Sequence, residues 1–251
     1  MRKRSLKMSM HETPLYSPFQ RSVRLLAFVL FTLFSLYYLV LLAKDFQLSY
    51  VGFLFLAFLF AILSVDFLSG LLHWAADTWG TVDWPIVGKS IIQSFRLHHT
   101  DQKGITRHDF VETNGDVAIV AVLVQALGLV LLPFFAFHYF FLAYFGFLTI
   151  IGQMTNQFHK WAHQDRVPRG IRFLQKCHII LSSQHHETHH TAPHQNYYCI
   201  TFGWLNPFLT AISFFPFLEK IVTFTTGLKP RLDVSVEKRR VRKSLRLVSK
   251  A

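Results

Sequence analysis

A run of nineteen residues without a charged side chain, Leu25–Ala43, constrains the fold of this chain more than any other feature. About 20 apolar residues in a helix cross a hydrocarbon core of ~30 Å. A basic stretch precedes the run, which is also how a signal peptide begins. The run is longer than the apolar part of a typical signal peptide, and no small-x-small cleavage site precedes Lys44. It therefore predicts a membrane-spanning helix.

Three further apolar runs predict three further spans. The second, Leu48–Leu72, is interrupted only by Asp66, and the third and fourth, Val117–Leu132 and His138–Gln153, are separated by a turn at Pro133. The chain is 51% hydrophobic and only 16% charged, against about 25% charged residues in soluble domains. We therefore expect an all-α integral membrane protein with about four transmembrane helices.

A last apolar segment, Leu205–Thr226, contains Pro207, Pro216, Glu219 and Lys220. These residues would interrupt or charge a spanning helix, so the segment favours an interfacial or re-entrant helix pair.

The net charge of +12 lies entirely in two tails. Residues 1–24 carry a net charge of +5 and residues 229–251 a net charge of +7, whereas the acidic and basic residues between them are equal in number. This distribution argues against a nucleic-acid-binding protein, which would need basic residues spread over a folded surface. Two cysteines cannot form a disulfide framework, so a small secreted disulfide-rich protein is also excluded. We therefore expect a membrane-embedded domain over residues 25–228, flanked by two basic cytoplasmic tails.

Two polar stretches, 73–116 and 154–204, separate the apolar runs. With four spans, both stretches fall on the side of the basic tails, and an excess of Lys and Arg marks the cytoplasmic side. Twelve of the fourteen histidines lie in these two stretches. The exceptions are His11 and His138, and a lone histidine is more often a surface residue than a ligand.

The histidine spacings predict metal ligands. His159 and His163 stand at i and i+4, on one face of a helix, and His73 and Asp77 repeat that spacing at the end of the second span. The candidate ligands are His73, Asp77, His98, His99, His159, His163, His185, His186, His189 and His190. Weaker candidates, ligands or residues that orient a ligand, are Asp66, His108, His178 and His194. Asp66 is expected to accept an imidazole N–H and so to orient a ligand.

This number of nitrogen and carboxylate ligands suggests two metal ions, and nitrogen-rich sites beside lipid suit iron in oxygen chemistry. A zinc hydrolase is the alternative, but its His-Glu-x-x-His pattern is absent, since Glu187 is followed by Thr-His-His. A histidine-rich metal transporter would place its ligands midway through the spans, and a membrane scaffold would show no paired spacing.

Several longer motifs carry a family resemblance. They begin at Gly70 (GLLHWAADTWG), Arg96 (RLHHTD), Asn156 (NQFHKWAH), His185 (HHETHHTAPH) and Tyr198 (YCITFGWLNP). In this order they resemble the plasmanylethanolamine desaturase family, also called Kua or CarF-like, over about residues 60–230. A plastid fatty-acid desaturase that acts on phosphatidylglycerol belongs to the same fold family and is the competing assignment.

The resemblance implies conversion of the alkyl chain of plasmanylethanolamine into a vinyl ether. It also implies two iron ions, molecular oxygen, and electrons from NADH through a reductase and a b-type cytochrome. The residues then expected to be catalytic are His73, His98, His99, His159, His163, His186, His189 and His190. The membrane would be the endoplasmic reticulum in a eukaryote and the inner membrane in a bacterium.

Overall fold

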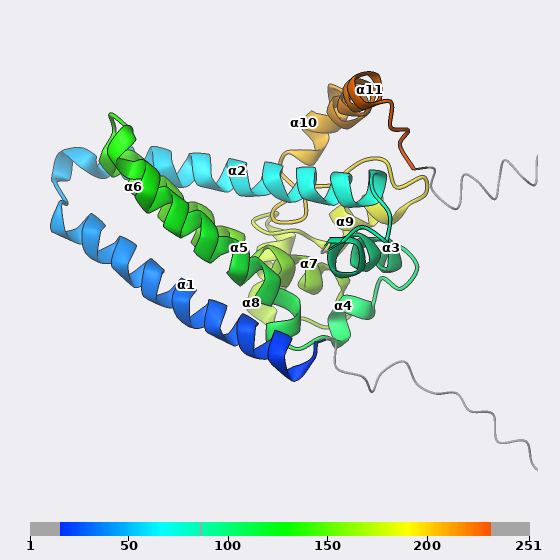
Figure 1. Cartoon of the computed structure of the whole chain (residues 1–251), viewed down its shortest axis with the longest axis horizontal. Coiled ribbons are helices and arrows are strands. Elements are labelled where there is room, and N and C mark those ends of the chain that lie inside the picture. The colour runs from blue at the N-terminus through cyan, green and yellow to red at the C-terminus, as the bar shows by residue number, and fades with distance from the viewer. Residues whose placement is uncertain (1–15, 86, 232–251) are drawn as a thin grey trace, which may run out of the picture.

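A computed structural model of the chain describes residues 16–85 and 87–231 (Figure 1). Every regular element in these two ranges is helical, which confirms the predicted all-α class. Most of each basic tail lies outside the described residues, and so does His11.

Four helices form the elongated part of the molecule. They are α1 (Pro18–Lys44), α2 (Val51–Thr78) after the short η1 (Leu48–Tyr50), α5 (Phe110–Leu131) continued by η3 (Leu132–Phe134), and α6 (His138–Gly152). In the described part of the chain, three stretches are long and apolar enough to cross a membrane: Pro18–Lys44, Leu48–Thr78 and Phe110–Phe134. Helix α6 has 15 residues, about 22 Å at the α-helical rise. The protein is therefore a multi-pass membrane protein, and a fourth span stays a prediction.

Polar residues decide where two of the long helices begin. Ser17 and Gln20 form a capping box at the start of α1, and Asp109 and Glu112 form one at the start of α5. In each box a side chain accepts a backbone N–H that has no partner within the helix. Helix α5 therefore begins at Phe110, before the apolar run that starts at Val117 in the sequence.

The long helices pack in pairs, α1 against α5 and α2 against α6. Small residues allow the close approach, because a Cβ atom on Gly115 would lie 2.8 Å from the side chain of Arg24. The outward faces of the helices stay apolar and exposed, as at Leu33 and Leu123. Exposed apolar surface of this extent belongs against lipid.

The short helices gather at one end of the long ones, opposite the turn between α1 and α2 (Figure 1). They are η2 (Gly88–Ile92), α3 (Gln93–His98), α4 (Gly104–Arg107), α7 (Thr155–His163), α8 (Arg169–Lys176), α9 (Ser183–His190), α10 (Asn206–Ala211) and α11 (Phe214–Thr226). Helix α2 continues past Leu72 to Thr78 and so carries His73 and Asp77 into this end of the molecule.

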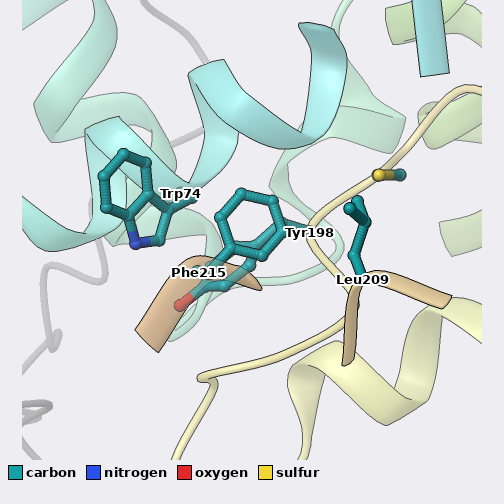
Figure 2. Packing of buried hydrophobic residues seen from close by; sticks show 5 residues of the cluster. Trp74, Tyr198, Leu209 and Phe215 are labelled. Atoms are coloured by element: carbon teal, nitrogen blue, oxygen red, sulfur yellow. The ribbon is translucent and has the colours of Figure 1, made fainter. Parts of the chain in front are cut away.

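The last two helices pack on the end of α2. Trp74 of α2 forms a buried cluster with Tyr198, Leu209 and Phe215 (Figure 2), and Cys199 belongs to the same cluster. The apolar segment after Trp204 is divided into α10 and α11 at Ser213, which has a left-handed backbone with φ 53°. The predicted helix pair is present, and its place at the membrane interface stays a prediction.

Candidate metal centre

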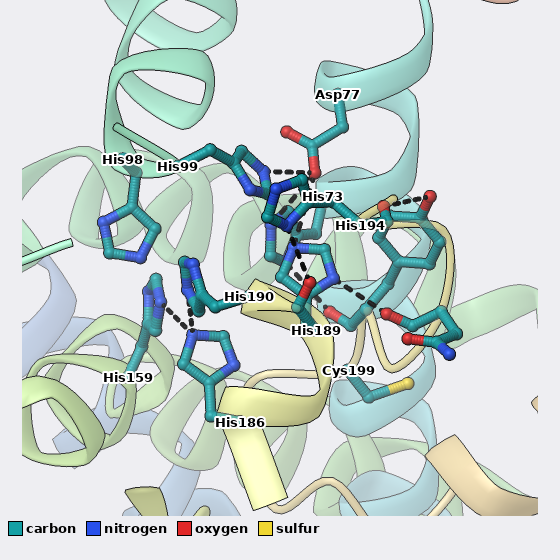
Figure 3. Close-up of polar contacts among 12 residues, drawn as sticks. His73, Asp77, His98, His99, His159, His186, His189, His190, His194 and Cys199 are labelled. Atoms are coloured by element: carbon teal, nitrogen blue, oxygen red, sulfur yellow. Dashed lines mark hydrogen bonds and ion pairs between the residues drawn. The ribbon is translucent and has the colours of Figure 1, made fainter. Parts of the chain in front are cut away.

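Two groups of potential metal ligands meet where α2, α3, α7 and α9 converge (Figure 3). The five-histidine group consists of His98, His159, His163, His186 and His190. The mixed group consists of His73, Asp77, His99 and His189. In each group, one ligand atom per residue lies within 4.8 Å of all the others.

The five histidines of the first group come from three helices, and the Nε2 atoms of their imidazoles point at one another. His159 Nε2 lies 2.8 Å from His186 Nε2 and 3.1 Å from His163 Nε2. His190 Nε2 lies 3.0 Å from His186 Nε2, and His98 Nε2 lies 2.8 Å from His163 Nε2. Two pairs of this group stand at i and i+4, on α7 and on α9, so the periodicity of each helix places both rings on one face.

The mixed group is centred on one carboxylate oxygen. Asp77 Oδ2 lies 2.9 Å from His99 Nε2, 3.3 Å from His73 Nε2 and 3.6 Å from His189 Nε2. His73 and His189 are fully buried, and the side chain of Asp77 is 11% exposed. A carboxylate and three imidazoles form a donor set for a borderline divalent cation such as zinc or iron.

Backbone carbonyls orient two imidazoles of the mixed group. His73 Nδ1 lies 3.1 Å from the carbonyl oxygen of Tyr198, and His189 Nδ1 lies 2.8 Å from that of Asn196. A carbonyl only accepts, so each Nδ1 carries the hydrogen and each Nε2 keeps its lone pair. Both of these Nε2 atoms are buried without a hydrogen-bond partner, as is Asp77 Oδ1. Unpartnered buried polar atoms are costly, and a metal ion would satisfy them, so the residues fit a bound cation.

The electrostatics of the five-histidine group favour neutral imidazoles. Burial, and then the neighbouring imidazoles, holds the pKa values of His98, His159, His186 and His190 below the usual range. Burial and the nearby Lys103 ammonium lower the pKa of His163 to about 4. Only a neutral imidazole has a lone pair for a metal. At neutral pH these side chains are therefore in the form that binds one.

The two groups are immediate neighbours. His98 and His99 are consecutive, as are His189 and His190, and in each pair one residue belongs to each group. The ring centroids of His99 and His190 lie 5.4 Å apart, and those of His73 and His159 lie 6.3 Å apart. The arrangement can therefore hold two metal ions side by side, which is the number that the sequence predicts.

A polar clamp holds the 198–205 loop against α2. Asp66 is fully buried, and its Oδ1 accepts the backbone N–H groups of Phe202 at 2.9 Å and Gly203 at 2.8 Å. Its Oδ2 accepts the N–H of Leu205 at 3.0 Å. The expected acceptance of an imidazole N–H is therefore wrong. Seven residues separate Asp66 from His73, about 10 Å along a helix, which is too far for a hydrogen bond. Asp66 orients His73 indirectly, by fixing the loop that supplies the Tyr198 carbonyl.

Two further residues complete this clamp, Ser69 and Asn206, and the sequence did not predict an orienting role for either of them. Ser69 Oγ accepts the N–H of Ile200 at 3.1 Å, and the side chain of Asn206 bonds both the N–H and the carbonyl of Cys199. Gly70 permits the close approach, since its Cβ would lie 2.6 Å from Cys199 Sγ. The sequence signal that could have indicated Ser69 is a polar residue within an apolar run, because such a residue needs a hydrogen-bond partner once it is buried.

A second set of polar contacts positions α7 and its two histidines. Asn114 of α5 donates to the side-chain oxygen of Gln157 at 3.2 Å, and Lys103 Nζ donates to the carbonyl oxygen of His163 at 2.8 Å. Lys160 Nζ donates to the carbonyl of His108. These contacts fix α7 against α5 and against the loop after α3.

Four candidate histidines lie outside both groups. His185 faces Asn206, whose amide nitrogen lies 3.1 Å from its Nε2, and packs against Gly203. His108 contributes its carbonyl to Lys160, and the carbonyl of His178 accepts the indole N–H of Trp204 at 2.6 Å. The ring of His194 lies 4.6 Å from that of His99 but belongs to neither group. The ligand role predicted for His185 is not supported by this arrangement.

Cysteine does not contribute to either group. Cys199 is buried and its Sγ faces Gly70, to one side of the imidazoles (Figure 3), and Cys177 is exposed. A donor set of imidazoles and one carboxylate, without thiolate, argues against a structural zinc site and an iron–sulfur cluster.

The fold and this site define a class, namely helical membrane proteins with two adjacent, histidine-rich groups of potential metal ligands at one end of the long helices. The lipid desaturase domain matches residues 62–233. The chain belongs to the lipid desaturase family, and membership makes it an oxidoreductase.

Curated relatives agree with this assignment. Over 221 residues the chain is 43% identical to plasmanylethanolamine desaturase of Myxococcus xanthus, covering 87% of this chain and 77% of that protein. It is 47% identical to plasmanylethanolamine desaturase 1 of Mus musculus over 185 residues, 68% of this chain and 65% of that protein. Chloroplastic fatty acid desaturase 4 of Arabidopsis thaliana is 34% identical over 66% of this chain and half of its own length. No solved structure matches the chain.

Proposed function

We propose that this protein is a di-iron desaturase that converts the alkyl chain of plasmanylethanolamine into a vinyl ether, giving a plasmenylethanolamine. The observation that carries the proposal is the pair of adjacent buried ligand groups, taken with the identity to two proteins named for this activity. Molecular oxygen is the oxidant, and NADH supplies electrons through a reductase and a b-type cytochrome.

The side chains of the two groups would hold the two irons. Imidazole suits iron, and a bound iron pair would supply the oxygen activation that breaking an unactivated C–H bond requires. Removal of two hydrogens from adjacent carbons, with one O2, two electrons and two protons, yields the double bond and two waters.

The surrounding residues would prepare the ligands and keep bulk water away. The carbonyls of Tyr198 and Asn196 keep the proton on Nδ1 of His73 and His189, so that Nε2 faces the metal. Seven of the nine ligands are buried, and the side chains of Asp77 and His99 are only 11% and 13% exposed, which keeps bulk water away from the reaction.

The position of the site favours oxidation near the headgroup. The ligands lie at the end of α2 and in the short helices beyond it, at one end of the spanning helices (Figure 1). A carbon beside the glycerol ether oxygen lies at that depth, whereas carbons in the middle of a chain lie ~10 Å deeper. A desaturase that acts close to the headgroup of another phospholipid, such as phosphatidylglycerol, is the alternative, and the relative from Arabidopsis thaliana is the observation in its favour.

The cytoplasmic placement of both tails and of the site belongs to the same proposal, as does residence in the endoplasmic reticulum or in a bacterial inner membrane. The basic charge of the tails would attract an acidic electron donor or anionic lipid headgroups.

Lipid analysis of a host that lacks plasmalogens tests the proposal. After expression of this chain, we expect a lipid two hydrogens lighter than the alkyl precursor, which releases a fatty aldehyde in mild acid. A product of the same mass that survives acid would carry its double bond elsewhere and would support the acyl-chain alternative.

A further inference from the structure

A small pocket opens directly beside the mixed group. Its volume is about 90 Å³, and its wall includes Asp77, His99, His194, Tyr198, Glu219 and Arg231. Two of these residues are metal ligands in our proposal, so a molecule in the pocket lies next to the metal centre. A pocket of this size has room for a small polar group.

The pocket carries one positive and one negative side chain besides the ligands. Within residues 16–85 and 87–231, neither Arg231 nor Glu219 is part of an ion pair, and so the two do not neutralise each other. Glu219 Oε1 accepts the indole N–H of Trp74 at 3.2 Å. The backbone N–H of Arg231 donates to the carbonyl of Thr78 at 2.9 Å, which ties the start of the C-terminal tail to the end of α2.

We propose that this pocket binds the zwitterionic headgroup of the lipid substrate, with Arg231 pairing with the phosphate and Glu219 with the ammonium. The assignment rests on the proposed function, which it deepens by naming residues that select the substrate. A guanidinium matches phosphate geometry, and a carboxylate is the natural partner of an ammonium group.

The location of the pocket explains how such binding would serve the reaction. A headgroup held against Asp77 and His99 places the first carbons of the ether-linked chain at the mixed group, and the rest of the chain lies in the bilayer. Positioning of this kind supplies much of an enzyme's advantage, because the reacting carbon must be held within reach of the oxidant. A headgroup without an ammonium, such as glycerol, would leave Glu219 facing the pocket without a cation.

The experiment compares two 1-alkyl lipids that differ only in the headgroup, phosphoethanolamine and phosphomethanol. The second lipid keeps the phosphate and lacks the ammonium. The full-length protein with its electron donors is assayed on both lipids for kcat/KM, and competitive binding of both lipids is measured without turnover. The variants are Glu219→Gln, which keeps the oxygen that accepts from Trp74, and Arg231→Gln, at an exposed position. Lys220→Gln and Lys229→Gln are matched controls, because both lysines are exposed and lie outside the pocket.

We expect the wild-type protein to prefer the ethanolamine lipid by roughly tenfold, the size of one hydrogen bond to a charged group. Glu219→Gln should abolish this preference, because its kcat/KM for the ethanolamine lipid should fall to its value for the methanol lipid. Arg231→Gln should weaken binding of both lipids by roughly tenfold, because both carry the phosphate. The two controls should match the wild type.

Retention of the wild-type preference by Glu219→Gln, or unchanged binding of both lipids by Arg231→Gln, would overturn the headgroup assignment. A wild-type protein that shows the expected binding preference but forms no vinyl ether would overturn the proposed function and not the pocket.

Discussion

Replacement of Asp66 by Asn should remove one metal ion and leave the other. The carboxylate of Asp66 holds the 198–205 loop through three backbone N–H groups, and this loop supplies the carbonyl that orients His73. The carbonyl that orients His189 belongs to Asn196, just before this loop. Both histidines belong to the mixed group. The five-histidine group is built on α3, α7 and α9, and the hydrogen bonds of Asp66 do not reach it.

The size of the effect follows from these contacts. In Asp66→Asn one oxygen can still accept from Phe202 and Gly203, but the new amide NH2 faces the N–H of Leu205 at the position of the present 3.0 Å bond. Loss of a hydrogen bond to a charged group costs about 1.5–3 kcal/mol. A loss of about 2 kcal/mol corresponds to roughly 30-fold in an equilibrium constant, within the 10- to 100-fold range typical of residues that orient metal ligands.

The assay is the metal content of purified protein after dialysis against a weak chelator, with thermal unfolding in detergent as the check on folding. We expect Asp66→Asn to lose metal from the mixed group alone. Ser64→Ala is the matched control, because Ser64 lies on the same helix and its hydroxyl accepts from Tyr144 rather than from the 198–205 loop. Full metal content in Asp66→Asn, or loss of both ions together in a protein that still unfolds cooperatively, would refute the reasoning.

Three further outcomes are expected. His159→Ala should abolish desaturation and empty the five-histidine group without affecting membrane insertion, and more than a tenth of wild-type turnover would contradict the ligand assignment. His138→Ala, at an exposed position beside the loop between α1 and α2, should leave activity near that of the wild type. Gly70→Ala should destabilise the protein by about 1–3 kcal/mol through overpacking, because the new methyl group would lie 2.6 Å from Cys199 Sγ. The added substitution Cys199→Ala removes this sulfur and should recover part of the lost stability in thermal unfolding, and no recovery would place the strain elsewhere. Cysteines introduced at Lys103 and near the C-terminus should both be protected from an impermeant thiol reagent applied outside the cell; labelling of only one of them would require an odd number of spans between them.

The general character of this protein could be predicted from local patterns. Uncharged apolar runs predict long helices, because a chain in lipid has to satisfy its backbone hydrogen bonds within each segment. The i, i+4 spacing of His159 and His163 predicts a shared face, because that geometry belongs to a single helix. Helix ends were predicted less well, as at α5, where a polar capping box extends the helix beyond its apolar run.

The sequence by itself determined that this chain forms apolar helices ending in a cluster of metal ligands. Tertiary structure alone decided which of these ligands belong to the five-histidine group and which to the mixed group. His98 and His99 are neighbours in the sequence but belong to different groups, and so do His189 and His190. Successive side chains on a helix point about 100° apart, so the group that each one joins depends on which helix packs opposite it. The role of Asp66 was decided in the same way, because its partners are backbone groups more than 130 residues away, and packing of the 198–205 loop on α2 brings them within 3.0 Å.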